Sequence, residues 1–287
     1  MTVTRCLLCA SCQTKPLDQY QEDYLVQCGR CGFVFSWKIP SEEELIRHYN
    51  TYDRHQAHSP VTTKRYHALL DGFERYRQTN NLLDVGCGGG HFLVEAKKRG
   101  WNVYGTEYTS EAVTLCTRQG IRMSQGKLDS GRYGRNERFD VITSFEVIEH
   151  ISNPREEVAH CHDLLRKGGI VYVTTPNFGS ISRSLARGKW NVLDYPEHLC
   201  YYTRPTLRGL FEGCGLKRIH SATTGISFDR LKRNVGEIRF SDQKNNDEQI
   251  RRLTEEKWLF RWTKKIVNAG LTLTSKGDTL KAVFQKV

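Results

Sequence analysis

Short apolar runs alternate with amphipathic stretches through the middle of the chain. Four of these runs have the length and composition of buried strands, namely 82–85, 103–105, 139–144 and 170–175. Between them, residues 110–119 and 155–166 have helical spacing, and glycine follows each stretch at Gly120 and Gly168. Strand–helix alternation of this kind predicts a parallel sheet with helices on both faces and with ligands outside the carboxyl ends of its strands.

The pattern changes after the last of these runs. Residues 178–203 leave the strand–helix rhythm and are rich in glycine, arginine and aromatic residues. A helix is predicted over 204–211, a strand over 216–221 and a last strand over 277–286. Because 178–203 follows the end of a strand, we expect it to form a lid over the binding face of the sheet.

A glycine-rich turn, Asp-Val-Gly-Cys-Gly-Gly-Gly, begins at Asp84 and leads into a predicted helix at His91. Glycine permits the tight turn, and the turn directs amide groups toward a ligand above the strand end. A dinucleotide fingerprint requires glycine where His91 stands, and Asp84 would repel a pyrophosphate. Glu107 follows Gly86 by 21 positions, at the end of the next strand, where a carboxylate can accept both hydroxyls of a ribose. A cofactor with an amine and a ribose but no phosphate fits this arrangement, and S-adenosylmethionine is such a cofactor. The alternative is an ordinary strand–helix turn.

Residues 82–107 resemble motif I and the second-strand acid of class I S-adenosylmethionine-dependent methyltransferases. The resemblance implies an α/β fold within residues 81–287. Its sheet would be Rossmann-like, seven-stranded and mostly parallel, with the last strand antiparallel between two others. The resemblance also places the cofactor at the glycine turn and at the loops after the third and fourth strands. The matching positions are Asp84, Gly86, Gly88, Glu107, Leu128, Asp129 and Phe145. In the family the loop after the third strand holds the adenine, so Leu128 would pack on the ring and Asp129 would accept its exocyclic amine.

Five of the ten cysteines lie within the first 31 residues. Cys6 and Cys9 form one Cys-x-x-Cys pair, Cys28 and Cys31 form a second, and 18 residues separate Cys9 from Cys28. Two such pairs joined by a hairpin give a tetrahedral thiolate cage that suits zinc. Four thiolates leave no open coordination position, so we expect a structural metal. Cys12 offers a competing pair with Cys9, and its role stays open. A disulfide or an iron–sulfur cluster is the alternative.

Residues 1–40 resemble the zinc-ribbon extension of a subset of bacterial methyltransferases that act on sugars and related metabolites. Residues 41–80 would then be a linker with N-terminal helices. Ser41 and Glu44 have the spacing of a capping box, and 61–76 has helical spacing. In this enzyme class the segment before motif I often folds over the cofactor.

A second motif, Phe-Glu-Val-Ile-Glu-His, follows the fourth strand at 145–150. Glu146, Glu149 and His150 are spaced i, i+3 and i+4, which predicts a shared helical face that could bind a divalent cation. A similar Glu-x-x-Glu-His run occurs in ubiquinone-biosynthesis O-methyltransferases, where it is linked to metal. The alternative is that Glu149 and His150 brace the loop by hydrogen bonds.

The predicted lid contains the candidate substrate residues. Its segment 196–203 resembles one in this enzyme subset that carries a histidine toward the substrate. A hydroxyl must lose its proton as it accepts a methyl group, so the site needs a base. His198 is the first candidate base and His150 the second, with a packing role as the alternative for His198. The candidate substrate contacts are Trp190, Tyr195, Glu197 and Tyr201.

Residues 225–270 are rich in charge and are predicted to form a helical insertion. Its apolar positions form a stripe surrounded by arginine and lysine, at Leu253, Trp258, Leu259, Trp262 and Ile266. We expect this stripe to pack on the domain or on the partner of a homodimer. The alternative is contact with a membrane surface that presents a lipid-linked substrate.

The formal net charge of the 287 residues is +11, which permits attraction to nucleic acid, anionic lipid or phosphorylated substrates without choosing among them. Nucleic acid is the less favoured partner, because Arg30 and Lys38 are the few basic residues among the aromatic residues of the ribbon. No apolar run is long enough for a membrane span, and the first five residues lack the apolar stretch of a signal peptide. These features predict a cytoplasmic protein.

The sequence therefore predicts an enzyme that moves a methyl group from S-adenosylmethionine to a small acceptor. By resemblance, the acceptor is a hydroxyl or carbon of a sugar or related metabolite, free, nucleotide-linked or lipid-linked. A quinone-type phenol is an alternative acceptor, and so is RNA or protein bound through the ribbon and the basic surface. A non-catalytic scaffold that has kept the cofactor fold is a further alternative.

Overall fold

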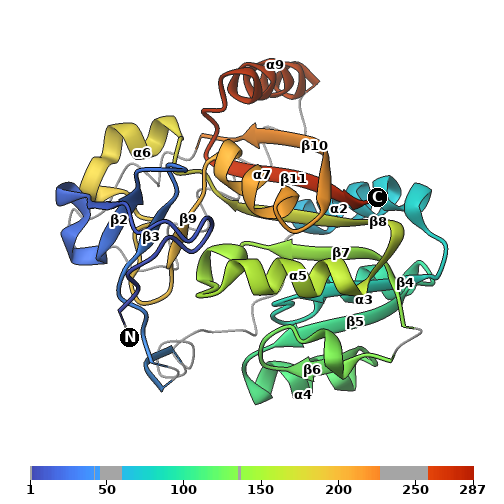
Figure 1. The fold of residues 1–287 in the computed structure, drawn as a ribbon. Helices are drawn as coiled ribbons and strands as arrows, with labels where there is room; N and C mark the ends of the chain where they lie inside the picture. The colour runs from blue at the N-terminus through green and yellow to red at the C-terminus, as the bar shows by residue number, and fades with distance from the viewer. Residues whose placement is uncertain (1, 42, 46–59, 135–136, 227–257) are drawn as a thin grey trace.

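The computed structural model describes residues 2–41, 43–45, 60–134, 137–226 and 258–287. Its main sheet has seven strands in the order β10-β11-β8-β7-β4-β5-β6 (Figure 1). β11 is antiparallel to both of its neighbours, and the ladders from β8 to β6 are parallel. This confirms the predicted Rossmann-like sheet with an antiparallel last strand. The strands are β4 (Asn81–Val85), β5 (Asn102–Glu107), β6 (Arg122–Gln125), β7 (Phe139–Phe145), β8 (Leu165–Pro176), β10 (Leu216–Thr224) and β11 (Thr279–Lys286).

Helices cover both faces of this sheet. On one face lie α2 (Pro60–Phe73), α3 (His91–Lys98) and α4 (Ser110–Arg118), and on the other lie α5 (Pro154–Leu164) and α7 (Arg204–Glu212). α6 (Ile181–Ala186) belongs to the lid, and α9 (Trp258–Thr274) packs on β10 (Figure 1). The 3-10 turns are η1 (Asp18–Asp23), η2 (Glu74–Tyr76), η3 (Ser130–Arg132), η4 (Ile148–His150) and η5 (Arg187–Lys189).

Successive residues of the central strands enter two different cores. Leu82 packs with Phe73 and Phe92 on the side of α2 and α3, whereas Leu83 packs in the core on the side of α5 and α7. A parallel strand covered on both faces buries both sets of alternating side chains. This is why the strands appear in the sequence as continuous apolar runs.

α5 ends at Leu164, two residues earlier than predicted, and β8 begins at once. The Nε of Arg166 donates to Asp140 over 2.5 Å, and its guanidinium also bonds the Tyr76 carbonyl. Asp140 accepts three further bonds, from the consecutive amides of residues 78–80. A buried carboxylate requires such partners, and the bond from Arg166 to Asp140 is made with Arg166 in extended backbone at the start of β8. This contact favours the end of α5 at Leu164.

The N-terminal segment and the lid share a second sheet, with the order β1-β2-β3-β9. The first three strands, β1 (Thr14–Pro16), β2 (Leu25–Cys28) and β3 (Val34–Ser36), form the predicted hairpin region. The fourth strand, β9 (Cys200–Tyr201), comes from the lid and pairs antiparallel with β3 (Figure 1). The lid is therefore part of the same structural unit as the N-terminal segment, which the sequence did not predict.

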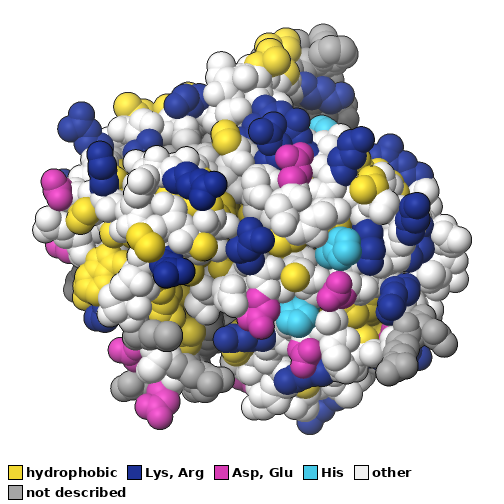
Figure 2. All heavy atoms as spheres, viewed as in Figure 1, with side chains coloured by type: hydrophobic (Ala, Val, Ile, Leu, Met, Phe, Trp, Pro, Cys, Tyr) yellow, Lys and Arg dark blue, Asp and Glu magenta, His cyan; other side chains and the backbone are white. Residues whose placement is uncertain are grey.

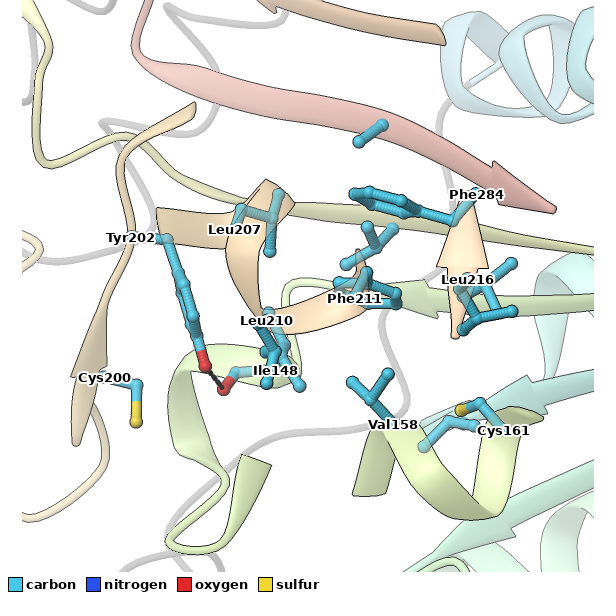
Figure 3. Close-up of a cluster of buried hydrophobic side chains, with 14 of the residues drawn as sticks. Ile148, Val158, Cys161, Cys200, Tyr202, Leu207, Leu210, Phe211, Leu216 and Phe284 are labelled. Carbon is cyan, nitrogen blue, oxygen red and sulfur yellow. Dashed lines mark hydrogen bonds between the residues drawn. The ribbon is translucent and has the colours of Figure 1, made fainter. Parts of the chain in front are cut away.

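Figure 3 shows the core that joins this unit to the main sheet. Phe211 of α7 and Phe284 of β11 stack with ring centroids 4.2 Å apart. At the other end of the cluster the Tyr202 hydroxyl, directly after β9, donates to the Ile148 carbonyl over 3.4 Å. One continuous core thus holds η4 between the sheet and the ribbon.

The predicted helical insertion is described only in part. Leu253 lies outside the described residues, and so do the side chains of Trp258, Leu259 and Trp262. Ile266, the remaining residue of the stripe, is 67% exposed. Among the described residues, no helix combines the length and the apolar composition that a membrane crossing requires. On the face in Figure 2, lysine and arginine side chains are interspersed with acidic ones.

Candidate active site

The turn after β4 is anchored to the neighbouring strand β5. The amides of Gly86 and Cys87 donate to the hydroxyl and carbonyl of Thr106, over 3.2 and 3.0 Å. Gly86 has a φ of +66°, and a Cβ at this position would lie only 2.6 Å from a methyl of Val147. Gly86 and Val147 both line the cavity described below. Glycine is required here because any side chain would fill the space between the turn and Val147.

Glu107 lies beside the turn at the end of β5. Its two carboxylate oxygens accept the amides of Gly88 and Tyr108, over 3.1 and 2.8 Å. Each carboxylate oxygen has two lone pairs, so each retains one for a further donor. Glu107 also lines the cavity, and two adjacent hydroxyls, as on a ribose, match its two acceptors. The residue therefore fits the predicted cofactor.

Asp84 is buried beneath the same turn. The Thr143 hydroxyl donates to its carboxyl group over 2.7 Å. Burial raises the pKa of Asp84 to about 7, the Thr143 bond opposes this, and the charge of Glu107 adds to it. A nearby cation would favour the ionised form, so Asp84 fits a cofactor that carries an amine.

A cavity of about 760 Å³ lies over the carboxyl ends of the parallel strands. Its size falls within the roughly 300–1,000 Å³ of small-molecule sites. The wall combines the turn, the loops after β5, β6 and β7, helix α5, the lid, and the segment after the ribbon. The lining residues are Ile39, Pro40, Leu45, Gly86, Glu107, Tyr108, Lys127, Leu128, Asp129, Arg132, Glu146, Val147, His150, Ile151, Ser152, Asn153, Glu156, Glu157, His160 and Glu197.

Most of the predicted cofactor positions lie around this cavity. Gly86, Glu107, Leu128 and Asp129 line it, and the backbone of Gly88 is fixed by Glu107. Phe145 is placed differently. Its ring packs against Phe92 and Tyr172, with centroids 5.1 and 5.6 Å apart, in the core on the side of α3.

His150 and Glu197 line another part of the same cavity, although 46 positions separate them in the sequence. His150 Nδ1 lies 3.5 Å from Glu197 Oε1. The rings of His150 and His198 meet edge to face, with centroids 4.8 Å apart. Burial lowers the pKa of His150 to about 3; His198 lowers it further and Glu197 opposes the shift. The imidazole that faces the cavity is therefore neutral at pH 7.

His198 does not line the cavity, but it touches His150, which does. Its Nδ1 lies 2.6 Å from the Val192 carbonyl oxygen. Because a carbonyl can only accept, Nδ1 must donate, and the lone pair of the neutral ring is on Nε2. This contact fixes the tautomer that a proton acceptor needs.

The expected shared helical face of Glu146, Glu149 and His150 does not form. Glu146 has a φ of +53°, outside helical geometry, and only the last three residues of the motif form the 3-10 turn η4. Glu149 is buried and accepts the Thr175 hydroxyl over 2.8 Å. Instead, ligand atoms of Glu149, His150 and His198 lie within 4.8 Å of one another, so these three side chains could hold a divalent cation.

The aromatic residues predicted to contact substrate pack against the ribbon. Trp190 and Tyr201 are buried around Phe178, with ring centroids 6.1 and 5.8 Å from it. The ring of Tyr195 packs edge to face on Tyr24, with centroids 4.8 Å apart. These three side chains bind the lid to the N-terminal unit. Of the four predicted substrate residues, only Glu197 lines the cavity.

The end of the ribbon contributes Ile39 and Pro40 to the cavity, and the segment after it contributes Leu45. The predicted capping box forms here: the Ser41 amide donates to the Glu44 carboxylate over 2.7 Å, and the Glu44 amide donates to the Ser41 hydroxyl over 3.2 Å. Residues 46–59 of the predicted linker lie outside the described residues, and none of residues 60–80 lines the cavity.

Helix α5 supplies three further cavity residues that the sequence pattern did not single out, Glu156, Glu157 and His160. Two of them, Glu157 and His160, are at least partly buried. The His160 ring bonds the Ser130 hydroxyl over 2.9 Å and thereby joins α5 to the loop after β6. Their spacing of i and i+3 on a helix next to the buried Val158 and Cys161 was the available signal. Two titratable residues at the edge of an apolar face indicate a polar pocket.

The four predicted zinc ligands come together at the N-terminus. The sulfurs of Cys6 and Cys31 are 3.5 Å apart, those of Cys9 and Cys28 are 3.6 Å apart, and all four lie within 4.8 Å. Tetrahedral zinc with bonds of ~2.3 Å separates its sulfurs by ~3.8 Å. Cys12 is exposed and outside the cluster. The donor set thus fits zinc without Cys12.

Both pairs form the same backbone turn. The Ala10 amide donates to the Cys6 carbonyl, and the Gly32 amide donates to the Cys28 carbonyl, each over 2.9 Å. Ala10 and Gly32 both have left-handed backbones, with φ of +56° and +73°. In each pair, the amides two and three residues later donate to the first thiol. Burial opposes ionisation of both thiols: at Cys28 the amides bring the pKa down to about 7, whereas at Cys6 burial prevails and raises the pKa to about 11. Such amides stabilise thiolates, the form that binds zinc.

Comparison with known proteins agrees with this geometry. Residues 49–221, more than half of the chain, match the model of a family described as a methyltransferase domain. A ubiquinone biosynthesis O-methyltransferase from Nitrosococcus oceani is 32% identical over 119 residues, which are 39% of this chain and 48% of the relative. A protein of the same name from Pasteurella multocida is 30% identical over 112 residues, 33% of this chain and 46% of the relative. The chain spans about half the length of the curated relatives it matches.

Solved structures show the same fold. A SAM-dependent methyltransferase from Archaeoglobus fulgidus aligns with a TM-score of 0.52 at 16% identity, covering 86% of this chain and 100% of its own. Phosphoethanolamine N-methyltransferase 2 from Haemonchus contortus, solved with S-adenosyl-L-methionine, aligns with a TM-score of 0.52 at 14% identity, covering 88% of this chain and 61% of its own. The glycine turn with its paired acid, the sheet order and the family match agree, and the chain belongs to the methyltransferase domain family, with the class I S-adenosylmethionine-dependent methyltransferase fold.

Proposed function

We propose that this protein transfers a methyl group from S-adenosylmethionine to a hydroxyl or carbon of a small acceptor, a sugar or related metabolite. The observation that carries the proposal is the single cavity that Glu107, His150 and Glu197 all line. Glu107, the carboxylate that would hold the nucleoside, and the side chains of His150 and Glu197 thereby face the same cavity. This is the arrangement that a transfer from a bound nucleoside cofactor to a second molecule requires.

The turn and its neighbours hold the cofactor in this proposal. S-adenosylmethionine, when bound, supplies a methyl carbon activated by the adjoining sulfonium. Glu107 accepts the two ribose hydroxyls with the lone pairs that its amide partners leave available. Leu128 packs on the adenine ring, and the buried Asp84 attracts the amine of the methionine portion.

The imidazole pair removes the proton of the acceptor hydroxyl. His198 is the first candidate base, because the Val192 carbonyl fixes the tautomer that leaves Nε2 free to accept. His150 is the second, since it lines the cavity itself. Glu197, 3.5 Å from His150, stabilises the positive charge that the pair acquires. Transfer to a carbon acceptor uses the same groups to remove the proton of the carbon that accepts the methyl group, and a neighbouring carbonyl on the substrate makes that C–H acidic.

A quinone-type phenol is the second candidate acceptor. It is favoured by the relatives named ubiquinone biosynthesis O-methyltransferase and by the Glu149, His150 and His198 cluster. A divalent cation held there would lower the pKa of a phenol bound to it. RNA or protein acceptors are less favoured, because Arg30 and Lys38 are the few basic residues among the aromatic residues of the ribbon.

We also propose that Cys6, Cys9, Cys28 and Cys31 hold one structural zinc ion. Their separations and the amides that surround them support this assignment. The metal would stabilise the ribbon that carries β3, the strand on which the lid is anchored through β9.

The test is an assay of S-adenosylhomocysteine release by the purified, zinc-loaded protein with three panels of acceptors: nucleotide sugars and sugars, catechols, and RNA. We expect turnover with a sugar-type acceptor, unaffected by EDTA added briefly before the assay. Turnover with catechols alone, lost in EDTA and restored by Mg²⁺, would instead support the phenol. Tight binding of S-adenosylhomocysteine without turnover in any panel would support a non-catalytic scaffold.

His198→Ala and His150→Ala test the base in the same assay. We expect His198→Ala to lower kcat at least 100-fold while the affinity for S-adenosylhomocysteine stays within about threefold. Unchanged kcat in His198→Ala with a large loss in His150→Ala would transfer the role to His150.

A further inference from the structure

One predicted cofactor contact already has partners within the protein. Asp129, expected to hold the exocyclic amine of adenine, caps η3 by accepting the Gly131 amide over 2.9 Å. Its other oxygen lies 3.6 Å from Arg132 Nε. Lone pairs remain on both oxygens of Asp129, so it stays a candidate acceptor, but its partners already compensate its charge. A carboxylate without such partners at this end of the cavity would gain more from the amine.

The position of the ring follows from the order of the strands. Glu107 ends β5, and the neighbouring strand β6 leads into the loop with Leu128. If Glu107 holds the ribose, as the proposed function states, the base extends from β5 toward this loop. Helix α5 borders the loop there, since His160 bonds Ser130. The carboxylates of α5 that line the cavity are therefore candidates to contact the edge of the adenine ring that carries the exocyclic amine.

Two α5 carboxylates line this end of the cavity, and they differ. Glu156 is exposed and accepts the Asn153 side-chain amide over 2.9 Å. Glu157 is only 7% exposed, and its Oε1 has no hydrogen-bond partner among the described residues. An unpartnered carboxyl oxygen at such burial is costly unless a ligand supplies the donor.

We propose that Glu157 accepts the exocyclic amine of the adenine ring and so makes the site selective for adenosine-type ligands. This inference rests on the proposed function, since it requires the cofactor to lie in this cavity. It assigns to α5 a specificity contact that the sequence analysis had placed on Asp129.

The electrostatics of Glu157 agree with this role. Burial raises its pKa to about 7, Glu156 adds to the shift, and Lys127 opposes it. A donor such as an aromatic amine favours the ionised carboxylate and compensates for part of its burial. Lys127, which lines the same end of the cavity, keeps that negative charge accessible near neutral pH.

The test compares two ligands by calorimetry: S-adenosylhomocysteine and its purine analogue, in which hydrogen replaces the exocyclic amine. We expect the unmodified protein to prefer S-adenosylhomocysteine by about 10–100-fold, as for loss of a hydrogen bond to a charged group. In Glu157→Leu the preference should fall to within about threefold, and Glu157→Gln, which keeps a neutral acceptor, should lie between. Glu111→Gln, in the first turn of α4 and outside the cavity lining, is the control of equal charge and should retain the full preference.

Each other result overturns the inference. An undiminished preference in a folded, zinc-loaded Glu157→Leu protein would exclude Glu157, and Glu157→Gln provides the same test if the leucine variant does not fold. A preference lost in Asp129→Asn but kept in Glu157→Gln would return the contact to Asp129. Equal binding of both ligands by the unmodified protein would refute the inference and leave the proposed function intact. Failure of the folded protein to bind either ligand would refute the proposed function itself.

Discussion

The Thr143 hydroxyl donates to the Asp84 carboxyl group over 2.7 Å beneath the glycine turn, and Asp84 has no basic partner among the described residues. Its pKa is raised to about 7 by burial. The folded state therefore favours the protonated form, and the resulting stability is present below pH 4 and is lost as the pH rises through 7.

Asp84→Asn should remove this pH dependence. At pH 8 the variant without ligand should be more stable to unfolding than the unmodified protein, by roughly 2–4 kcal/mol, and at pH 4 the difference should vanish. Its affinity for S-adenosylhomocysteine should fall because the charge facing the amine is lost. Guanidinium unfolding at the two pH values and calorimetry measure both effects.

Asp140→Asn is the matched control for that experiment. Asp140 is also buried, but it accepts three amides and the Arg166 guanidinium. Its replacement should therefore destabilise the protein at pH 8, by about 3 kcal/mol or more. Equal effects of the two variants would contradict our account of Asp84.

Glu107→Gln should weaken binding of S-adenosylhomocysteine by about 10–100-fold. The amide can replace only one of the two carboxylate acceptors that Gly88 and Tyr108 orient. Calorimetry measures the change, and Glu111→Gln, in the first turn of α4, provides a control of equal charge. Unchanged affinity in Glu107→Gln would refute the ribose assignment.

Cys28→Ser should lower the zinc content below one ion per chain, whereas Cys12→Ser should keep it at one. Elemental analysis of the purified variants decides this. We also expect Cys28→Ser to lower turnover more than cofactor affinity. The ribbon strand β3 pairs with β9, and the Leu199 amide, directly before β9, donates to the Glu149 carbonyl over 2.8 Å. Loss of the metal would therefore disturb the loop that carries Glu149 and His150. Full zinc content in Cys28→Ser would contradict the ligand set.

Ala10→Gly should stabilise the ribbon. Ala10 has the left-handed backbone that Gly32 adopts in the equivalent turn, and a Cβ makes that conformation less favourable by about 1 kcal/mol. The reverse substitution, Gly32→Ala, should destabilise by a similar amount. The concentration of chelator needed to remove the metal should rise in the first variant and fall in the second. The same shift in both would show that the two turns are not equivalent.

Local pattern was sufficient for the sheet and for the cysteine cluster. Buried parallel strands produce apolar runs, and the two Cys-x-x-Cys pairs bring their own turns with them. The position of Glu107 was also predictable, because adjacent parallel strands end at the same edge of the sheet. In each case the residues that meet are close in sequence or are related by the regular geometry of the sheet.

The remainder of the site depends on contacts that no local pattern contains. Trp190 and Tyr201 were predicted to contact substrate because they are aromatic residues of the segment after β8. Both side chains instead pack in the core beside the ribbon, where β9 pairs with β3. Glu146 has a left-handed backbone, which broke the predicted helical face. Glu157 lines the cavity because α5 packs against the loop after β6, a contact between segments about 30 residues apart that helical spacing alone does not contain.

The pairing of β9 with β3 also sets an order of events during synthesis. The ribbon strands leave the ribosome early, but their fourth strand begins only at Cys200, more than 160 residues after Ser36. At about 5–20 residues per second, the open edge of β3 waits roughly 10–30 s for its partner. An unpaired edge is a template for association with other chains, so the nascent protein is most exposed to misassembly in this interval. All four zinc ligands precede β9 in the chain, so zinc can bind before β9 is synthesised. The bound metal would hold β3 in its folded position until β9 pairs with it.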